Sequence, residues 1–357
     1  MTPASDIAAK TPAWVCAPGV LKVPFLDVFL NDYDLRRLPG DQVQAVLGWG
    51  LKPTAAAGRR WAEANNRPYV ALEDGFLRSV GIGEAGAASL SLIVDDLGVY
   101  YDATRPSRLE HLIQTADAWC DAATTARARA LIDRIVASGV SKTNMGGPLD
   151  PGLLRPDRRV LIVDQTFGDA SIGYGLATQD SFDAMVAAAR RDEPEAQLIV
   201  KRHPAVAAGK KRGCITDLSG VTLVDADVRP ADLLAAVDAV YCVTSALGFE
   251  ALLRGLPVRC FGAPFYSGWG LTTDAVDTGR RGAARSVEQV AAAALIAYSR
   301  YVDPVTGERC EAEQALERLI ALRDRADRLA GPWSAVGFAP AKRPPVRRLL
   351  NSPKARM

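Results

Sequence analysis

The sequence predicts an α/β fold with two parallel, doubly wound sheets in tandem. Short runs rich in β-branched residues alternate with longer Ala-rich stretches of helical character, as such sheets require. The length of 357 residues favours two domains. Residues 141–157 are rich in Gly and Pro, which is typical of a linker. We therefore expect two Rossmann-like domains, 1–150 and 151–335, followed by a basic, Pro-containing tail at 336–357.

The second half carries the clearer pattern, with five apolar runs that we interpret as buried strands. They are residues 159–164, 197–201, 221–224, 239–243 and 257–261. Helices are expected between them at 181–191, 231–237 and 247–254, with Ser181 as an N-cap and Gly255 as a helix end. The first half gives weaker strand signals at 43–47, 68–72 and 91–94.

Composition excludes several classes of protein. Hydrophobic residues make up 48% and charged residues 24%, as in an ordinary globular chain. No apolar stretch approaches 18 residues and no secretory signal is evident, so we expect no membrane span and no export. The six cysteines are scattered without a C-x-x-C pair, which favours a reduced, cytoplasmic protein without a zinc site. A net charge of +2 argues against a nucleic-acid partner.

The C-terminal tail concentrates positive charge. Residues 331–357 contain six Lys or Arg side chains and no acidic residue. Two interpretations remain open: a solvated, disordered tail, or a segment that contacts anionic lipid headgroups of the inner membrane.

Ligands of open α/β sheets bind beyond the carboxyl ends of the strands, so we examined the residues there. The strand at 159–164 is followed by Gln165, Gly168, Asp169 and Ser171, a polar turn suited to face a substrate. Asp169 has an alternative role as the cap of the following helix.

The next strand ends in Lys201, Arg202 and His203, and Pro204 holds His203 in an extended conformation. An imidazole held in this way can face a phosphate, although a lone histidine at a strand end is also an ordinary surface residue.

The strand at 239–243 is followed by Thr244 and Ser245 at a helix start, where free N–H groups favour anions. Glu250 lies one turn into that helix. It could accept the hydroxyls of a ribose, or it could simply lie near the positive end of the helix dipole.

These strand ends together predict a carboxylate, a phosphate site and a ribose acceptor. The sequence has neither a G-x-G-x-x-G turn nor a P-loop, which favours a nucleotide-sugar donor over a dinucleotide or a triphosphate. Two such domains facing across a cleft describe the GT-B glycosyltransferase architecture, with 1–150 expected on the acceptor side and 151–335 expected to bind the nucleotide sugar. In the first half, Glu73 and Asp74 follow a strand and are candidates for acid/base work. The acidic turn at Asp95 and Asp96 is more typical of a structural turn than of a Mg²⁺ site.

Seven motifs resemble those of the bacterial capsule polysaccharide β-Kdo transferases, the KpsC-type family, in family order between Gly48 and Asp274. They are residues 48–53, 72–79, 91–98, 165–171, 203–204, 243–250 and 264–271. The resemblance implies a GT-B fold and transfer of Kdo from CMP-β-Kdo with retention at the anomeric carbon. Many family members carry two transferase modules in tandem; this chain has one, which implies one linkage type.

The resemblance also implies roles for single residues. Retention is attributed to a covalent sugar adduct on a carboxylate that maps to Asp169, and a double displacement accounts for it chemically. Glu73, with Asp74 as the alternative, would deprotonate the acceptor hydroxyl. His203 and Ser245 would hold the phosphate, and Glu250 the ribose.

The remaining expected site residues surround these. Gln165, Gly168, Ser171, Lys201 and Thr244 are assigned to donor binding. The clamp for the Kdo carboxylate is expected among Arg78, Lys142 and Lys201. We expect no metal and no cofactor besides CMP-Kdo as substrate, and a saccharide or glycolipid as acceptor. A lipid-linked acceptor implies a peripheral location on the cytoplasmic face of the inner membrane.

Three alternatives remain open at this stage. The chain could be an inverting CMP-sugar transferase, a sugar-nucleotide 2-epimerase, or a non-catalytic capsule-assembly module. An epimerase would need no acceptor cleft, and an inverting enzyme would not need Asp169 as a nucleophile. For Trp49 and Trp269, packing at a domain edge is favoured over stacking on a sugar or base.

Overall fold

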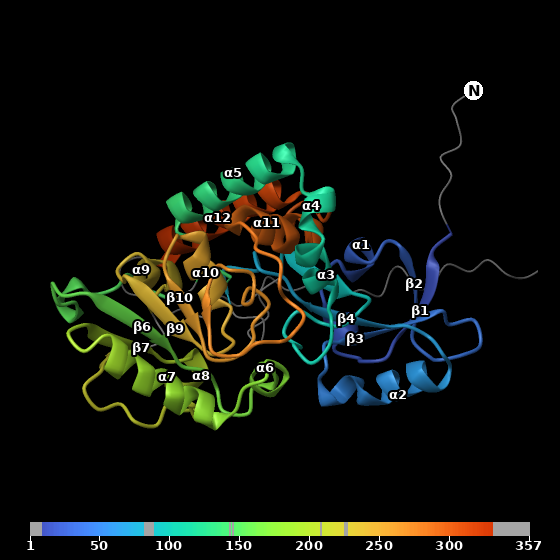
Figure 1. Cartoon of the computed structure of the whole chain (residues 1–357). Helices are drawn as coiled ribbons and strands as arrows, with labels where there is room; N and C mark the ends of the chain where they lie inside the picture. Colours follow the sequence, from blue (N-terminus) through green and yellow to red (C-terminus); the bar gives the residue numbers. More distant parts are fainter. Residues whose placement is uncertain are drawn as a thin grey trace, which may run out of the picture.

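The computed structural model describes residues 9–81, 89–142, 144, 146–207, 209–224 and 228–330. Two β-sheets lie next to each other with helices on their faces (Figure 1). The predicted basic tail, residues 336–357, lies outside the described residues. Within the described ranges, no helix combines the length and the apolar composition that a bilayer span requires.

The first sheet has seven strands in the order β13-β12-β5-β4-β3-β1-β2. Their bounds are β1 Thr11–Val15, β2 Tyr33–Arg36, β3 Ala45–Trp49, β4 Tyr69–Asp74, β5 Ser91–Asp95, β12 Ser299–Val302 and β13 Arg309–Cys310. Strands β1 to β4 are parallel, whereas β5, β12 and β13 each pair antiparallel to their neighbours.

The antiparallel direction of β5 corrects the expectation of a wholly parallel first sheet. A parallel pair needs a crossover connection, usually a helix. The described residues between β4 and β5 contain no helix, so the chain turns back and β5 runs antiparallel along the edge of β4.

The second sheet has six strands, all parallel, in the order β11-β10-β9-β6-β7-β8. Their bounds are β6 Arg159–Val163, β7 Gln197–Lys201, β8 Thr222–Val224, β9 Ala239–Cys242, β10 Val258–Cys260 and β11 Thr273–Asp274. Numbered from β6, this is the Rossmann order 3-2-1-4-5-6, and it confirms the predicted α/β fold. The strand order reverses between β6 and β9, so these two strands define the switch point where ligands of such sheets bind.

The chain returns to the first sheet near its C-terminal end. Strand β12 pairs with β5, although residues 299–310 fall within the segment 151–335 that the sequence assigned to the second domain. The physical reason is that β5 exposes an edge, and β12 satisfies the hydrogen bonds of that edge.

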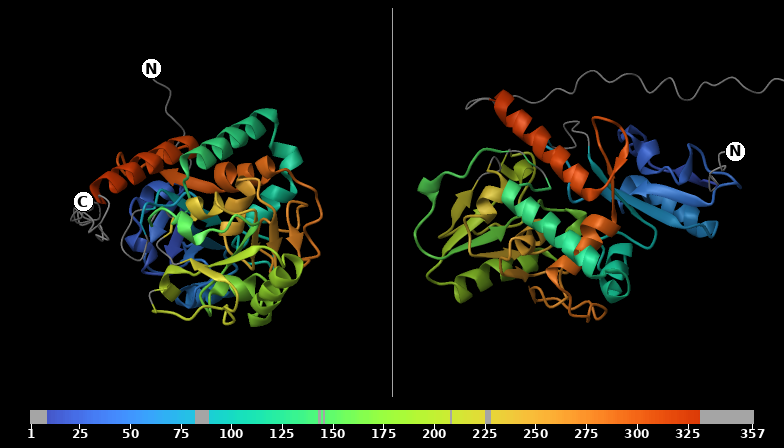
Figure 2. Two further views of the ribbon diagram at one scale, coloured as in Figure 1. Left: turned by 90° about the vertical axis from the view of Figure 1, so that its left-hand side faces the viewer. Right: turned by 90° about the horizontal axis from the view of Figure 1, so that it is seen from above.

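Helices cover the sheets in layers. Helices α5, α11 and α12 lie side by side above the junction of the two halves, α7 covers the lower face of the second sheet, and α2 that of the first (Figures 1 and 2). The helices are α1 Leu26–Phe29, α2 Ala56–Ala64, α3 Arg108–Gln114, α4 Ala116–Trp119, α5 Ala122–Ser138, α6 Ala170–Tyr174, α7 Gln179–Asp192, α8 Pro204–Ala207, α9 Pro230–Leu234, α10 Leu247–Leu253, α11 Val287–Ala291 and α12 Ala312–Ala330.

Local signals fix the ends of these helices. The Asp121 side chain accepts the Thr124 N–H at the start of α5, and Gly139 with φ +65° ends it. Helix α7 begins two residues before the predicted start. Ser181 is therefore not its N-cap; its hydroxyl instead accepts the Thr178 N–H from within the first turn.

One continuous hydrophobic core joins the two halves. It contains Ile93 of the first sheet, Leu161 and Val240 of the second, and Ile132 of α5, each at most 2% exposed. A separate cluster lies between α7 and the lower face of the second sheet, with Phe182 at 0% exposure. Because the main core is shared, burial of apolar surface holds the two halves in one arrangement.

A buried ion pair adds to this contact. Glu110 of α3 accepts from Arg280 and Arg281, with distances of 2.9 Å to Arg280 Nε and 3.0 Å to Arg281 Nε. The Arg281 side chain is 2% exposed and that of Glu110 is 8% exposed. Removal of one partner would leave a buried charge without compensation.

We therefore expect Glu110→Ala to lower the free energy of unfolding by about 3 kcal/mol, because Arg281 stays buried without its carboxylate. Urea denaturation would measure this change. The matched control is Glu317→Ala on α12. This variant removes the carboxylate that pairs with the exposed Arg134, and it should barely change the urea midpoint. Equal losses of unfolding free energy in the two variants would show that burial does not make the Glu110 ion pair more important than the exposed one.

Candidate active site

A hydrogen-bonded cluster of side chains lies at the switch point of the second sheet. Gln165, which follows β6, donates from Nε2 to Thr244 Oγ1 at 2.9 Å and accepts the Thr244 N–H at 3.0 Å. Ser171 Oγ lies 3.3 Å from both Gln165 Nε2 and Thr244 Oγ1. The structure therefore brings together three predicted donor-binding residues, with Gln165 buried and the two hydroxyls half-buried. They hold the ends of β6 and β9 at a fixed distance.

Asp169 lies on the turn that follows. Gly168 has φ +79°, a conformation that favours glycine, and this sharp turn starts helix α6. Asp169 caps that helix, with Oδ1 accepting the Ser171 N–H at 2.9 Å. The capping interpretation is thus confirmed, and the exposed carboxylate is oriented by that bond.

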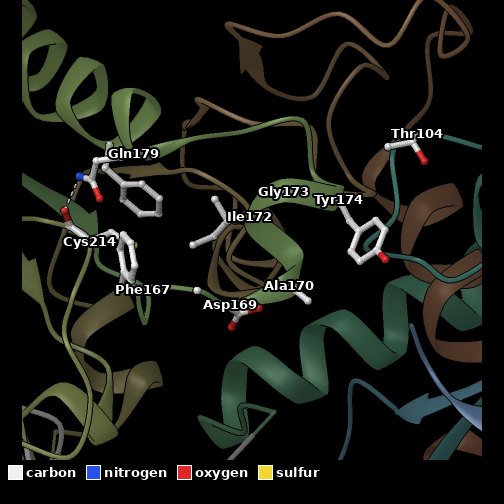
Figure 3. A pocket seen from close by; sticks show the side chains of 11 residues that line it. Thr104, Phe167, Asp169, Ala170, Ile172, Gly173, Tyr174, Gln179 and Cys214 are labelled. Atoms are coloured by element: carbon white, nitrogen blue, oxygen red, sulfur yellow. Dashed lines mark hydrogen bonds between the residues drawn. The ribbon is translucent and has the colours of Figure 1, made fainter. Parts of the chain in front are cut away.

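A pocket of about 520 Å³ opens beside Asp169. Figure 3 shows Asp169 near the middle of its lining, with Phe167 toward one end and Tyr174 and Thr104 toward the other. Thr104 comes from the first half of the chain, and the neighbouring Ala103 N–H donates to the Tyr174 carbonyl at 2.8 Å. Residues from both halves therefore line this pocket.

The predicted phosphate site at the end of β7 contains one buried and one exposed residue. Lys201 is 8% exposed, and its Nζ donates to the Val228 carbonyl at 3.0 Å. His203 is exposed, and its carbonyl accepts the N–H groups of Val206 and Ala207 at the start of α8. Of the two, His203 is the one that presents its side chain to solvent at this strand end.

Glu250 connects the second half to the segment after α5. Its Oε1 accepts the backbone N–H of Lys142 at 3.0 Å. Its Oε2 is buried and, among the described residues, has no hydrogen-bond partner. A buried carboxylate oxygen without a donor is costly, so this atom is suited to a ligand that supplies one. Ser245, five residues earlier, accepts the Leu247 N–H with its hydroxyl.

Glu73 and Asp74 are the last two residues of β4, and the pleat directs them to opposite faces. Asp74 Oδ2 lies 2.7 Å from Nε of Arg78, and Arg78 also donates to the Ser79 hydroxyl. The side chains of Asp74 and Arg78 are thus already paired with each other.

Glu73 has a different environment. Burial raises its pKa to about 7; Lys142 opposes this shift and Asp74 reinforces it. Gly50 allows the close packing here, because a Cβ at that position would lie 2.7 Å from Glu73 Oε2 and 2.4 Å from the Tyr101 hydroxyl. A carboxylate with a pKa near neutrality suits general acid/base catalysis.

Lys142 lies between the two carboxylate sites. Burial lowers its pKa, but Tyr100, Asp74 and Glu73 raise it, and the net pKa is above the usual value. Its Nζ is 3.4 Å from the Tyr100 hydroxyl. A stably charged ammonium close to Glu73 is consistent with the predicted role in binding a carboxylate.

Other predicted features have structural roles. The Asp95 carboxylate accepts the N–H groups of Leu97, Gly98 and Arg108 and the Tyr298 hydroxyl, as expected for a structural turn. Trp269 is fully buried and donates to the Phe265 carbonyl at 2.8 Å, which confirms packing for that tryptophan.

Sequence reasoning missed Tyr101, Thr104 and Tyr174. The Tyr101 hydroxyl accepts the Leu51 N–H at 2.9 Å, and its ring centroid is 6.1 Å from that of Tyr174. The aromatic pair at residues 100–101 begins two positions after the motif at 91–98 and was a usable signal. Thr104 carries no such signal, because only tertiary packing brings it to the pocket.

The two sheets, the Rossmann order of the second and the carboxylates at its strand ends define an α/β fold of the GT-B type. The chain belongs to the capsule polysaccharide biosynthesis protein family, whose model matches residues 44–151 and 129–301.

Two curated relatives support this membership. The chain is 42% identical over 359 residues to the capsule polysaccharide modification protein LipA of Neisseria meningitidis serogroup B, covering 97% of this chain and 51% of that protein. It is 41% identical over 281 residues to the lipopolysaccharide-processing protein LpsZ of Rhizobium meliloti, covering 77% and 64%. The chain spans about half the length of the first relative.

Two solved structures match as well. One is the Thermosulfurimonas dismutans KpsC, beta Kdo 2,4 transferase, with 41% identity, a TM-score of 0.82 and coverage of 87% of this chain and 98% of that one. The other is the beta Kdo 2,7 transferase of the same protein, with 26% identity, a TM-score of 0.67 and coverage of 88% and 100%. The resemblance to the KpsC-type family is therefore confirmed.

The raised pKa of Glu73 predicts a pH-dependent stability. The folded chain favours protonated Glu73. The resulting contribution to the free energy of unfolding is present below the pKa of 4.5 in the unfolded chain, and it is lost as the pH rises through about 7. Glu73→Gln removes this titration. As the pH rises from 5 to 8, the unfolding free energy of wild type should therefore fall by roughly 2–3 kcal/mol relative to that of Glu73→Gln.

Urea denaturation at the two pH values measures this difference. Glu63→Gln, an exposed position on α2, controls for the loss of a carboxylate. A constant difference between wild type and Glu73→Gln across the pH range would show that Glu73 does not titrate there.

Proposed function

We propose that this chain is a retaining β-Kdo transferase that moves Kdo from CMP-β-Kdo to a saccharide or lipid-linked saccharide. The observation that carries the proposal is the match to the KpsC beta Kdo 2,4 transferase, which extends over 98% of that chain at 41% identity. The oriented carboxylate of Asp169 beside a pocket and the raised pKa of Glu73 support the same chemistry.

In the first displacement, Asp169 attacks C2 of Kdo while the bond from C2 to the CMP phosphate oxygen breaks. The transition state resembles an oxocarbenium ion, which a carboxylate stabilises from one face. Oδ1 is held by the Ser171 N–H, so Oδ2 is the oxygen that would form the ester. CMP departs with the electron pair, and a glycosyl ester on Asp169 remains.

In the second displacement, the acceptor hydroxyl attacks C2 from the side that CMP left. Glu73 takes the hydroxyl proton, and the bond from C2 to Asp169 breaks. Two inversions give net retention and a β-linkage. Asp169 is regenerated as a carboxylate, and Glu73 returns its proton to solvent.

Donor binding uses the second half. The ribose hydroxyls would donate to Glu250 Oε2, the buried oxygen that otherwise has no donor among the described residues. His203 with Ser245 would bind the phosphate, where charge accumulates as CMP departs. Lys142 would bind the Kdo carboxylate, since Arg78 already pairs with Asp74.

We also propose that the linkage formed is β-2,4. This chain is 41% identical to the 2,4 transferase and 26% identical to the 2,7 transferase, with TM-scores of 0.82 and 0.67.

Contact of the basic tail with the inner membrane, for a lipid-linked acceptor, is a further part of this proposal.

Intact-protein mass spectrometry after mixing with CMP-Kdo tests the donor and the nucleophile. Wild type should gain the mass of one Kdo residue, and Asp169→Asn should gain none. Asp180→Asn, an exposed position on α7, serves as the matched control and should form the adduct. Normal transfer without any adduct would remove the nucleophile role of Asp169 and favour an inverting mechanism. CMP binding with neither adduct nor transfer would favour a non-catalytic module.

Product analysis tests the linkage. With a Kdo-terminated acceptor, a three-bond carbon–proton correlation in NMR should join C2 of the new Kdo to H4 of the acceptor Kdo. A correlation to H7 would overturn the 2,4 assignment and leave the donor assignment intact. Isomerisation of the nucleotide sugar without transfer would favour a 2-epimerase.

A further inference from the structure

A short segment after helix α5 joins the two halves of the chain at the candidate site. It comprises residues 140–144, of which 140–142 and 144 are described, and we call it the connecting segment. Lys142, whose ammonium lies close to Glu73, belongs to it. The other described residues of the segment are at most 6% exposed. The contacts of these buried neighbours therefore fix the backbone that carries the Lys142 side chain.

Asn144 attaches the connecting segment to the first half. Its Nδ2 donates to the Ser79 carbonyl at 3.0 Å, and its backbone N–H donates to the same oxygen at 3.3 Å. Nδ2 also donates to the Ser141 carbonyl at 2.8 Å, while Oδ1 accepts the Ser141 N–H at 3.0 Å. In addition, the Ser79 N–H donates to the Lys142 carbonyl at 3.4 Å. One buried amide side chain thus holds the backbone on both sides of Lys142.

Arg254, directly after α10, attaches the connecting segment to the second half. Its Nη2 donates to the Val140 carbonyl at 3.1 Å, and its Nη1 donates to the Glu250 carbonyl at 2.9 Å. Glu250 Oε1 accepts the Lys142 N–H at 3.0 Å. The segment is therefore bonded to this part of the second half at two points. A planar guanidinium suits this task, because its donors reach two carbonyls at once in a fixed geometry.

These bonds limit where the Lys142 ammonium can lie. Its Nζ is 3.4 Å from the Tyr100 hydroxyl and 6.0 Å from the ring centroid of Phe76. In this position the ammonium favours the charged form of Glu73 and counteracts the desolvation that raises the pKa of that carboxyl. A lysine stem is flexible, so a displaced backbone would allow the charge to move away.

The other titratable groups that affect Glu73 come from the strands and turns around it. Lys52, after β3, also favours the charged carboxylate, whereas the neighbouring Asp74 disfavours it, and Lys142 has the largest effect of the three. Burial raises the pKa values of the three nearby tyrosine hydroxyls, which therefore stay neutral around pH 7: Tyr69, Tyr100 and Tyr101. The charge of Glu73 thus depends chiefly on where Lys142 is held.

We propose that Asn144 and Arg254 are positioning residues of the transferase reaction. By fixing the connecting segment from both halves, they hold the Lys142 ammonium beside Glu73 and keep that carboxylate ready to accept a proton. The inference rests on the proposed function, because it uses Glu73 as the base. Both residues act through Lys142, since neither is among the side chains that line the pocket beside Asp169.

The pH dependence of kcat/KM for the acceptor tests this inference, because the acceptor step is the one in which Glu73 takes a proton. Asn144→Ala and Arg254→Met should each raise the midpoint of the acid limb by about one pH unit, since the ammonium no longer favours the carboxylate. The ratio of kcat/KM at pH 6 to that at pH 9 should then fall about ten-fold. Arg254→Lys keeps a donor for the carbonyls and should recover part of this change.

Arg285→Met is the matched control. The Arg285 side chain is 7% exposed and donates to the carbonyls of Ile113 and Gln114 at 2.8 and 2.6 Å, contacts that do not involve the connecting segment. This variant should lower the free energy of unfolding and leave the acid limb unchanged. An equal shift of the acid limb in Arg285→Met would assign the effect to general destabilisation and overturn the inference.

Urea denaturation separates this inference from the proposed function, because it requires no turnover. The unfolding free energy of a protein with Glu73, relative to its Glu73→Gln counterpart, falls with rising pH until the pKa in the folded chain is passed. This fall should end near pH 7 for wild type, and about one pH unit higher when both proteins also carry Asn144→Ala.

The two measurements together decide between the outcomes. If wild type transfers no Kdo but the fall extends to higher pH with Asn144→Ala, the positioning role stands and the proposed reaction fails. If wild type transfers Kdo and neither the acid limb nor the fall moves, the positioning role fails and the reaction stands. A shift toward lower pH would also overturn the inference, because the connecting segment would then hold positive charge away from Glu73.

Discussion

The packing of Phe76 against Phe249 and Phe265 is the contact on which the arrangement of the site depends. Phe76 belongs to the first half, and its ring centroid lies 5.7 Å from that of Phe249 and 4.9 Å from that of Phe265 in the second. Phe76 follows Glu73 by three residues, and Phe249 directly precedes Glu250. This aromatic cluster, which gains both apolar burial and edge-to-face attraction, therefore fixes the acid/base candidate relative to the ribose candidate.

Around this contact, the chain gives three carboxylates three different environments. Glu73 is half-buried, and desolvation raises its pKa to about 7. Glu250 has one oxygen that accepts the Lys142 N–H and one buried oxygen without a partner among the described residues. Asp169 is exposed and oriented by a helix cap. Groups whose environments differ in this way can take different chemical roles at one pH. The proposed roles of base, ribose-binding group and nucleophile rest on these differences.

Much of the second sheet could be predicted because its strands are buried on both faces and stand out as continuous apolar runs, such as 159–164 and 197–201. The polar residues after those runs could be predicted to lie close together for the same reason: parallel strands end at one edge. Strands β12 and β13 could not be predicted, because β12 pairs with β5 across more than 200 residues of chain. The direction of β5 was also missed, since a strand's own residues do not encode which neighbour it joins.

The sequence by itself determined the fold class, the family motifs and the chemical identity of the groups at the strand ends. These are local properties, set by residue type and spacing. Only the tertiary structure decided which of those groups remain available. It paired Asp74 with Arg78, joined Gln165 to Thr244, raised the pKa of Glu73 and brought Thr104 to the pocket. The physical reason is that burial, pairing and pKa depend on what approaches from distant parts of the chain, and that approach follows from shared packing of the core.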